Sequence, residues 1–463
     1  MGHERAKLRE KVCFGCGAMT YCVEMVLVLT YLMLYCSDVL KINVAVIGFV
    51  MAAVKVLDAV SDIVITTLAD RTDTRFGKYR VWMLFGIPLG VLLVLLFSNP
   101  PFLKNDTARV IWICLIYCLM VPVMETAVSC PYMAMIVTMS EHSKDRLDFS
   151  NARALGEAGA QIIVSAIAMP LVLRFGGYQN PAGWRLMAIV IAAVIILSAL
   201  VCFAGTKERI RIDYTLDTGR QMHLKEKMVP LKGNIPFWKL IAIIVLFMAH
   251  YYASSSIFTY FCIHNLGHEE WVSPLLTGGF VTQIIITVLL FYLGRKLEKR
   301  TLLIIGAVCI IAADLLLLFM ESFPLGLTYQ ILLGVGNGMF NGMAFALLPD
   351  VTDYTECKTG VALPGMISAI ATFAMKLGGA AATLLASRIL VWAHYDASLA
   401  VQTEATKFVI RLSLPLFSGA CIIAAVLLVL SLKRLFREDV EQYRKIIDAR
   451  VYLMERYRED TNP

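Results

Sequence analysis

Three charged residues stand in an otherwise apolar stretch of the chain between Val44 and Leu68: Lys55, Asp58 and Asp62. Spacings of three and four residues place their side chains on one face of a helix. A carboxylate in the middle of a bilayer costs roughly 3 kcal/mol on insertion scales, so such residues are rare and usually functional. Two carboxylates and one ammonium give this face a net charge of −1, which suits a small cation or a proton.

The composition indicates that the whole chain lies in a membrane. Of its 463 residues, 59% are hydrophobic, an excess that a soluble protein of this length would bury only with difficulty. The net charge of +7 does not indicate a nucleic-acid partner, because the basic residues cluster in short segments between apolar spans. The twelve cysteines are scattered, mostly within apolar segments, and Cys13 and Cys16 lie in no βαβ pattern. We therefore expect no cofactor and no redox centre.

Apolar segments of about 20 residues predict twelve transmembrane helices. They lie near 16–38, 43–69, 81–99, 108–137, 152–173, 184–204, 238–263, 272–294, 301–321, 325–348, 364–392 and 408–432. Most Lys and Arg residues fall in the segments on one side of these spans, beginning with Arg5, Lys7 and Arg9 in the first tail. The positive-inside rule then predicts a multi-pass protein of the cell membrane with both termini in the cytoplasm.

A polar, basic connector at 206–234 divides the spans into two sets of six. The sequence thus predicts an all-α membrane protein with a six-helix half at 1–205, which carries the charged trio, and a second half at 235–433. Residues 434–463 mix apolar and charged side chains, which predicts a cytoplasmic amphipathic helix. This six-plus-six layout resembles the major facilitator fold.

The charged trio belongs to the first of several motifs: Lys55-Val56-Leu57-Asp58-Ala59-Val60-Ser61-Asp62. The others are Asp70-Arg71 with Arg75-Phe76-Gly77-Lys78-Tyr79-Arg80, Cys130-Pro131-Tyr132 with Asp145-Arg146, Pro349-Asp350-Val351-Thr352-Asp353-Tyr354, and Lys376-Leu377-Gly378-Gly379. In this order they resemble motifs of the glycoside–pentoside–hexuronide:cation symporter family, the melibiose permease group of the major facilitator superfamily. The run at 349–354 resembles the loop after that family's tenth span. The resemblance covers nearly the whole chain and implies a secondary transporter, not an enzyme.

The resemblance implies a cation site on spans two and four, with these ligands: Asp58, Ser61, Asp62 and Thr126. Carboxylate and hydroxyl oxygens are hard ligands suited to Na⁺, and a carboxylate can take up H⁺ instead. Members of the family usually have Asn where Ser61 stands, which leaves both ions open. The alternative is a buried ion-pair network without a coupling ion, Lys55 with Asp58 and Lys376 with Asp62.

Two further charged residues are expected at this site. Lys376 lies in the middle of span eleven and is expected to approach the span-two carboxylates where the two halves meet. Its alternative role is that of a lysine extended toward the membrane surface. Glu125 neighbours Thr126 and is expected to influence the cation site, and as an intramembrane carboxylate it needs a partner or a watery cavity.

The residues that would bind a sugar are largely missing. The family's substrate-binding aspartate of span one aligns with Cys22, and its acidic position in span four aligns with Ser129. Arg153, at the expected cytoplasmic start of span five, and Thr372 in span eleven match their counterparts. Glu24 in span one is another candidate for a substrate contact, with a structural pair as the alternative. Tyr252 and Asn341 are further candidates, with interhelical hydrogen bonding as the alternative.

We therefore expect a monomeric symporter that moves a glycoside, a hexuronide or a related small organic solute together with Na⁺ or H⁺, by alternating access. Three alternatives stay open. The first is a lysolipid carrier of the same fold, compatible with the loss of the sugar-binding residues. The second is a carrier of a non-carbohydrate solute or an anionic glycoconjugate, and the third is a non-transporting sensor or scaffold.

Overall fold

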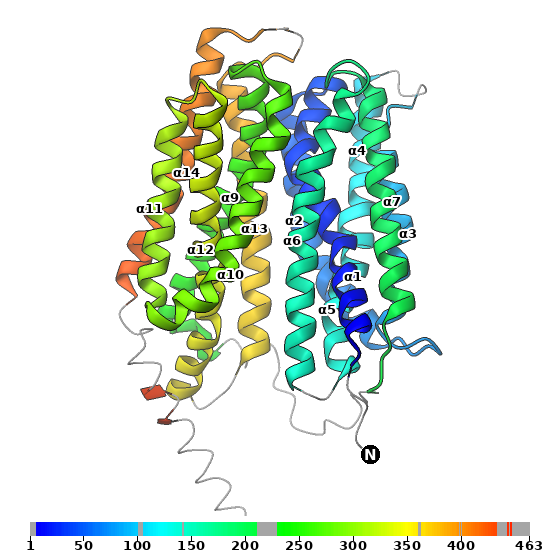
Figure 1. Ribbon diagram of the computed structural model, residues 1–463, viewed down its shortest axis with the longest axis vertical. Helices are drawn as coiled ribbons and strands as arrows, with labels where there is room; N and C mark the ends of the chain where they lie inside the picture. Colours follow the sequence, from blue (N-terminus) through cyan, green and yellow to red (C-terminus); the bar gives the residue numbers. More distant parts are fainter. Residues whose placement is uncertain are drawn as a thin grey trace, which may run out of the picture.

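The structure is a computed structural model that describes residues 6–100, 105–140, 143–210, 229–359, 363–397, 399, 401–432, 442–443 and 445–446. Every regular element in these residues is a helix, and the helices form twelve spans that run side by side (Figure 1). In the described part, eleven spans are long and apolar enough to cross a membrane, and Arg80–Leu96 is shorter. The predicted all-α membrane protein with twelve spans is confirmed.

The first half contains spans one to six. In chain order its helices are α1 (Leu8–Leu27), η1 (Val28–Leu32), η2 (Tyr35–Val39), α2 (Val44–Asp70), η3 (Arg80–Phe85), α3 (Gly86–Leu96), α4 (Asp106–Leu119), η4 (Met120–Glu125), α5 (Thr126–Met139), α6 (Ser143–Leu173) and α7 (Pro181–Gly205). The turn labelled η3 opens span three, and α4, η4 and α5 together form span four.

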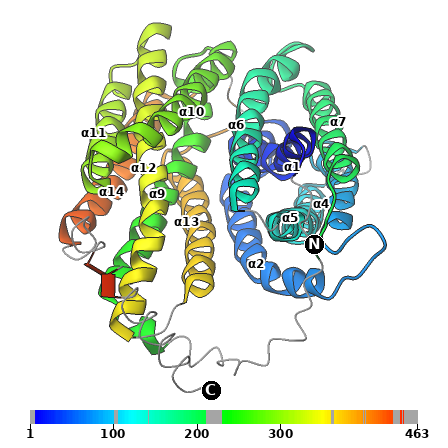
Figure 2. The same cartoon turned by 60° about the horizontal axis from the view of Figure 1, so that its bottom comes forward.

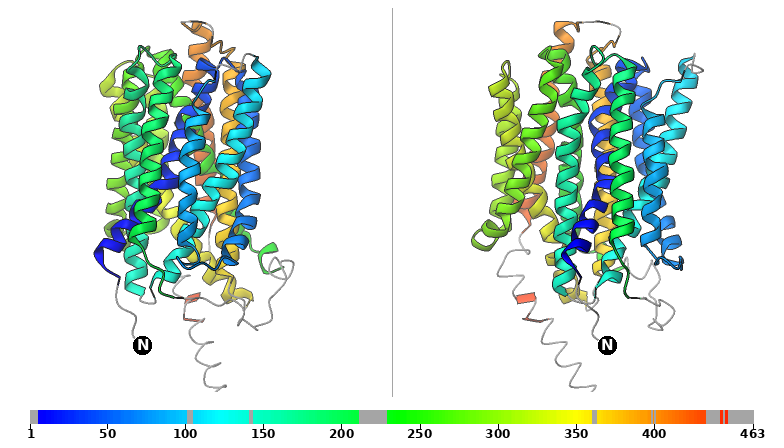
Figure 3. Two further views of the ribbon diagram at one scale, coloured as in Figure 1. Left: turned by 90° about the vertical axis from the view of Figure 1, so that its right-hand side faces the viewer. Right: turned by 45° about the vertical axis from the view of Figure 1, so that its right-hand side comes forward.

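The second half contains spans seven to twelve. Its helices are α9 (Ile235–Tyr260), η6 (Phe261–Asn265), η7 (Glu269–Trp271), α10 (Val272–Lys296), α11 (Lys299–Leu317), α12 (Phe323–Thr359), α13 (Pro364–Trp392) and α14 (Glu404–Ser431). Figure 3 shows that the helices of both halves run roughly parallel to one long axis. The connector and tail boundaries stay predictions, because most of 206–234 and 434–463 lies outside the described residues.

The two halves form two bundles that meet along two helix pairs. In the view of Figure 2, α2 and α6 of the first bundle face α13 and α10 of the second. Packing follows the same pairing, since α2 contacts α13 and α6 contacts α10. Both α2 and α13 carry charged residues that the sequence analysis selected: Asp58 and Asp62 on α2 and Lys376 on α13.

Two helices extend further than the sequence indicated. Helix α6 begins at Ser143, so Arg153 lies inside the helix and not at the start of span five. Helix α12 runs on to Thr359, so the motif at 349–354 is helical and not a loop. Two contacts hold this extension: the Lys299 ammonium lies 2.5 Å from an Asp350 carboxylate oxygen, and Asn234 donates to the Thr355 hydroxyl at 2.7 Å.

Spans one, four and seven each contain a π-helical segment. Such wide turns are rare in helices and frequent at functional sites. In span four the wide turn η4 includes Pro122, which has no backbone N–H to donate. Thr126, a predicted cation ligand, follows this turn directly.

Helix α2 approaches α13 closely at Gly48. A Cβ atom built on Gly48 would lie 2.0 Å from the Ser387 hydroxyl oxygen and 2.1 Å from the Ser387 Cβ. No side chain fits at that distance, so the glycine is what allows the two halves to touch here.

We predict that Gly48→Ala lowers the thermal unfolding midpoint of the purified protein, because overpacking costs about 1–3 kcal/mol. Gly159→Ala is the matched control, since a Cβ at Gly159 of α6 meets no atom within 4 Å. Both changes gain the same helix propensity, about 1 kcal/mol. Equal midpoints for the two variants would contradict the close approach of the halves.

Candidate functional site

The charged trio of α2 meets a lysine from the other half of the molecule. The Lys376 ammonium of α13 lies 3.0 Å from an Asp58 carboxylate oxygen and 2.7 Å from an Asp62 carboxylate oxygen. Lys55 is more distant, with its ammonium 3.9 Å from Asp58. The alternative drawn from the sequence paired Lys376 with Asp62 alone, whereas the structure has Lys376 bridging both carboxylates.

Span four adds polar groups to the same carboxylates. The Thr126 hydroxyl donates to Asp58 at 2.9 Å, and the Cys130 thiol lies 3.6 Å from Asp62. Ser61 donates its hydroxyl hydrogen to the Asp58 backbone carbonyl at 2.8 Å, so that hydrogen is committed to the helix. The structure therefore brings together the four residues predicted as cation ligands, and adds Cys130.

Two buried glutamates extend the site. Glu24 is 1% exposed and Glu125 is 9% exposed, and both interact electrostatically with Lys55 and Asp58. Each has one carboxylate oxygen that finds no hydrogen-bond partner in the described part of the chain. With Asp62 and Lys376 included, four carboxylates face two ammonium groups. Buried charge of this kind needs compensation, which a bound cation or protons would supply.

Tyr252 joins this group from α9 of the second half. It interacts electrostatically with Lys55 and Glu125. Its ring lies against Gly379 of α13, where an added Cβ would come within 3.2 Å of it. The aromatic ring therefore lies beside the charged cluster, on α9, which packs against the α13 helix that carries Lys376.

Arg153 belongs to a second polar cluster, between α1 and α6. Its guanidinium lies 2.5 Å from a Glu157 carboxylate oxygen, and the Tyr21 hydroxyl donates to the same oxygen at 2.5 Å. The Cys22 thiol lies 3.6 Å from the Glu157 backbone carbonyl. Sequence reasoning missed Glu157, although its position four residues after Arg153 on a helix is the usual spacing of an ion pair.

Three further predicted substrate contacts lie on α5, α12 and α13. Ser129 is half-buried on α5. Asn341 of α12 has a buried side-chain oxygen without a partner in the described residues. Thr372 of α13 is exposed and donates its hydroxyl to the Ser368 carbonyl at 3.1 Å. The substrate role of these three residues stays a prediction, as does that of Glu24.

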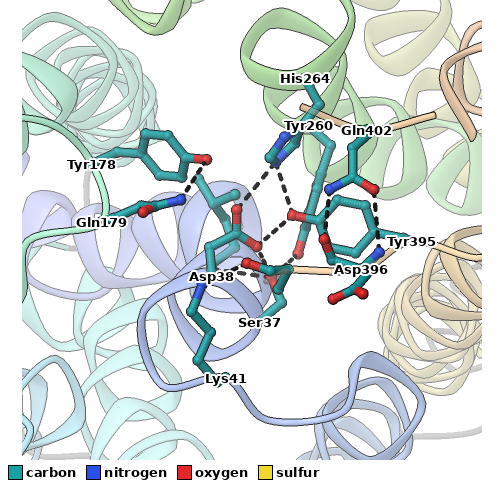
Figure 4. A network of polar contacts seen from close by, with 12 residues as sticks. Ser37, Asp38, Lys41, Tyr178, Gln179, Tyr260, His264, Tyr395, Asp396 and Gln402 are labelled. Carbon is teal, nitrogen blue, oxygen red and sulfur yellow. Dashed lines mark hydrogen bonds and ion pairs between the residues drawn. The ribbon is translucent and has the colours of Figure 1, made fainter. Parts of the chain in front are cut away.

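At the end of the bundle opposite the N-terminus, a network of polar side chains joins the halves (Figure 4). Asp38 of η2 lies 3.1 Å from the His264 imidazole and accepts a hydrogen bond from the Tyr395 hydroxyl at 2.6 Å. Beside it, the hydroxyls of Ser37 and Tyr260 are 2.8 Å apart. These contacts fasten span one to spans seven and eleven.

Three more hydrogen bonds connect the two halves. Ser256 donates to the Leu29 carbonyl at 2.8 Å, while Ser273 donates to the Ser165 carbonyl at 2.7 Å and Thr277 to the Ser165 hydroxyl at 3.0 Å. Together with the network around Asp38 they hold the two bundles together on this side.

This arrangement of two six-helix bundles with a charged site between them can be compared with known proteins. Residues 13–433 match the family described as MFS/sugar transport protein. The chain belongs to this family. The protein is therefore a transporter of the major facilitator superfamily and not an enzyme, as the sequence motifs implied.

Individual relatives of this chain support the same family assignment. It is 28% identical to the isoprimeverose transporter of Lactiplantibacillus pentosus over 82% of this chain and 79% of that protein. It is 27% identical to the putative glycoside/cation symporter YagG of Escherichia coli (strain K12), over 85% of each. A crystal structure of a D-xylose-proton symporter shares the fold, with a TM-score of 0.68 at 14% identity over 92% of this chain and 97% of that one. The resemblance to the glycoside–pentoside–hexuronide:cation family is confirmed.

We predict that Lys376→Met lowers the thermal unfolding midpoint and makes it depend strongly on Na⁺ or acid. Removing one partner of a buried ion pair costs about 3–5 kcal/mol, and a cation or proton at Asp58 and Asp62 would restore part of it. Lys239→Met is the control, because Lys239 contacts the Ser431 carbonyl at an exposed position. If Na⁺ and acid affected both variants alike, the bridge would have no electrostatic role.

Proposed function

We propose that the protein is a symporter in which Na⁺ or H⁺ replaces the Lys376 ammonium at the carboxylates of α2. The observation that supports this most directly is the bridge from Lys376 to Asp58 and Asp62. An ammonium between two carboxylates stands where a monovalent cation would be held by hard oxygen ligands. Thr126 would supply a further oxygen. Relatives named as symporters support the same function.

Displacement of the Lys376 ammonium by the cation would couple cation binding to the movement of the two halves. Because Lys376 belongs to α13 and the carboxylates belong to α2, a cation that takes the place of the ammonium breaks one contact between the bundles. The freed ammonium becomes available to a substrate between them. If substrate binding in turn keeps Lys376 away from the carboxylates, each ligand increases the affinity for the other, as symport requires.

The substrate in this proposal is a glycoside, a hexuronide or a closely related solute. The cluster of Arg153, Glu157 and Tyr21 is suited to such a ligand, since charged groups form strong hydrogen bonds with sugar hydroxyls. Glu157 would supply from α6 the carboxylate that Cys22 does not supply from α1. The relative named for isoprimeverose transport supports this class. We further propose that the protein acts as a monomer in the cell membrane with both termini in the cytoplasm.

We predict that Asp58→Asn and Asp62→Asn each abolish cation-driven accumulation of the substrate. Transport of the substrate down its own concentration gradient should persist. Each change removes one of the two carboxylates that would hold the cation in place of Lys376. Uptake into membrane vesicles would be measured with a panel of glycosides and glucuronides, with and without Na⁺ and a pH gradient. Asp106→Asn is the control, because Asp106 is an exposed residue paired with Arg109. Full gradient-dependent accumulation by both site variants would rule out the mechanism.

We predict that Glu157→Gln raises the KM for the transported sugar about 10- to 100-fold, the effect of losing a hydrogen bond to a charged group. The concentration of Na⁺ or H⁺ that gives half-maximal uptake should stay unchanged. Glu10→Gln serves as the control, since Glu10 pairs with Arg209 away from this cluster. A shift in cation dependence with an unchanged KM would instead assign Glu157 to the cation site.

A further inference from the structure

A chain of hydrogen bonds in the second half has no place in the proposed function. It joins four helices and is formed by Asp314 of α11, Ser418 of α14, His250 of α9 and Asn337 of α12. An Asp314 carboxylate oxygen lies 2.5 Å from the Ser418 hydroxyl oxygen, which lies 2.5 Å from His250 Nδ1. The other ring nitrogen, Nε2, lies 3.1 Å from the Asn337 side-chain oxygen.

When the Asn337 amide has its oxygen toward His250, as in this structure, counting hydrogens shows that the chain is one proton short in its ordinary ionisation state. Its three contacts each need one hydrogen, because every pair of atoms would otherwise meet through lone pairs. The Ser418 hydroxyl supplies one hydrogen and a neutral His250 supplies a second. The third must come from outside, either as a protonated Asp314 or as a doubly protonated His250. Ser254, whose hydroxyl lies 3.3 Å from His250 Nδ1, cannot supply the hydrogen needed in the shorter contact.

The surroundings of Asp314 and His250 also favour the binding of an added proton. Asp314 is 1% exposed, and His250 and Ser418 are 0% exposed. The second Asp314 oxygen and the hydroxyl of the nearby Tyr329 have no hydrogen-bond partner in the described residues. In the same part of the chain, no Lys, Arg or Glu and no other Asp interacts with Asp314 or His250. An ionised Asp314 would therefore have no counter-charge except an added proton.

We propose that Asp314, Ser418, His250 and Asn337 form a proton-binding site in the second half, separate from the carboxylates of α2. The site takes up one proton, which Asp314 and His250 share through the Ser418 hydroxyl. The bound proton makes the group electrically neutral as a whole and completes its three hydrogen bonds. This inference rests on the geometry of the second half and does not depend on the proposed cation site.

Asn337 makes the proton uptake reversible. When the proton leaves, the Asn337 amide can turn so that its NH₂ group donates to His250 Nε2 and supplies the missing hydrogen. Asn337 also lines a cavity with Tyr251, Gln283 and Gln330. The protonation state of the site therefore sets which end of the amide, nitrogen or oxygen, this cavity meets.

The test is the pH dependence of stability, which needs no substrate. Above about pH 7, an unfolded chain carries an ionised aspartate and a mostly neutral histidine. The folded protein then binds one more proton than the unfolded protein, so its stability falls as the pH rises. From this site alone, the equilibrium constant for unfolding should increase about tenfold per pH unit until the proton is lost.

Asp314→Asn should remove this dependence. The new amide can donate to Ser418, Ser418 to His250 and His250 to Asn337, so all three contacts are satisfied without an added proton. Equilibrium unfolding of the purified protein in mixed micelles would be measured across pH, with Asp106→Asn as the control. We expect the wild type and the control to be steeper than Asp314→Asn by about tenfold per pH unit. Identical curves would overturn the proposal.

The comparison is repeated in a chain that carries Asp58→Asn and Asp62→Asn, so failure of the proposed cation site cannot affect the result. If Asp314→Asn does not fold, infrared spectroscopy of that double variant decides, with isotope labels on aspartate and histidine. We expect a carboxylic-acid or imidazolium band near neutral pH that disappears at alkaline pH. Absence of both bands would overturn the proposal.

Discussion

The structure depends on the requirement that a charge inside a membrane must have a partner. Asp58 meets this requirement through Thr126 from span four, and through Lys376 from the other half of the molecule. Because Lys376 crosses between the halves, neutralising the carboxylates and joining the bundles are the same interaction. A ligand that competed with Lys376 for these carboxylates would therefore act directly on one contact between the halves.

The sequence alone predicted the spans and the charged trio, because long apolar runs and buried charges are local signals. It also predicted that Lys376 faces the trio, since a lysine in mid-span needs an acidic partner. It did not predict that Lys376 bridges both carboxylates. That contact depends on how α13 packs against α2, and the two helices are more than 300 residues apart in the chain. Nor did it predict the extension of α12, which is held by Lys299 and Asn234 through tertiary contacts.

The candidate substrate site shows a different limit of sequence reasoning. Alignment with the family points to Cys22, because the family carries its carboxylate there. The structure instead has a carboxylate at Glu157, one helical turn from Arg153 and within 2.5 Å of it. A helix pair packed as closely as α1 and α6 can carry an acidic group on either member. Loss of the aspartate in span one therefore does not mean that the site lost its charge.

The two buried acidic sites differ in how their charge is balanced. The carboxylates of α2 have lysines beside them, which a cation from solution would replace in the proposed mechanism. Asp314 has a serine and a histidine instead, and the proton proposed for this site would supply the balancing charge. A serine hydroxyl between two titratable groups both donates and accepts, so it can pass a proton without any movement of the backbone. One fold thus holds a site suited to ion exchange in its first half and a site suited to proton storage in its second.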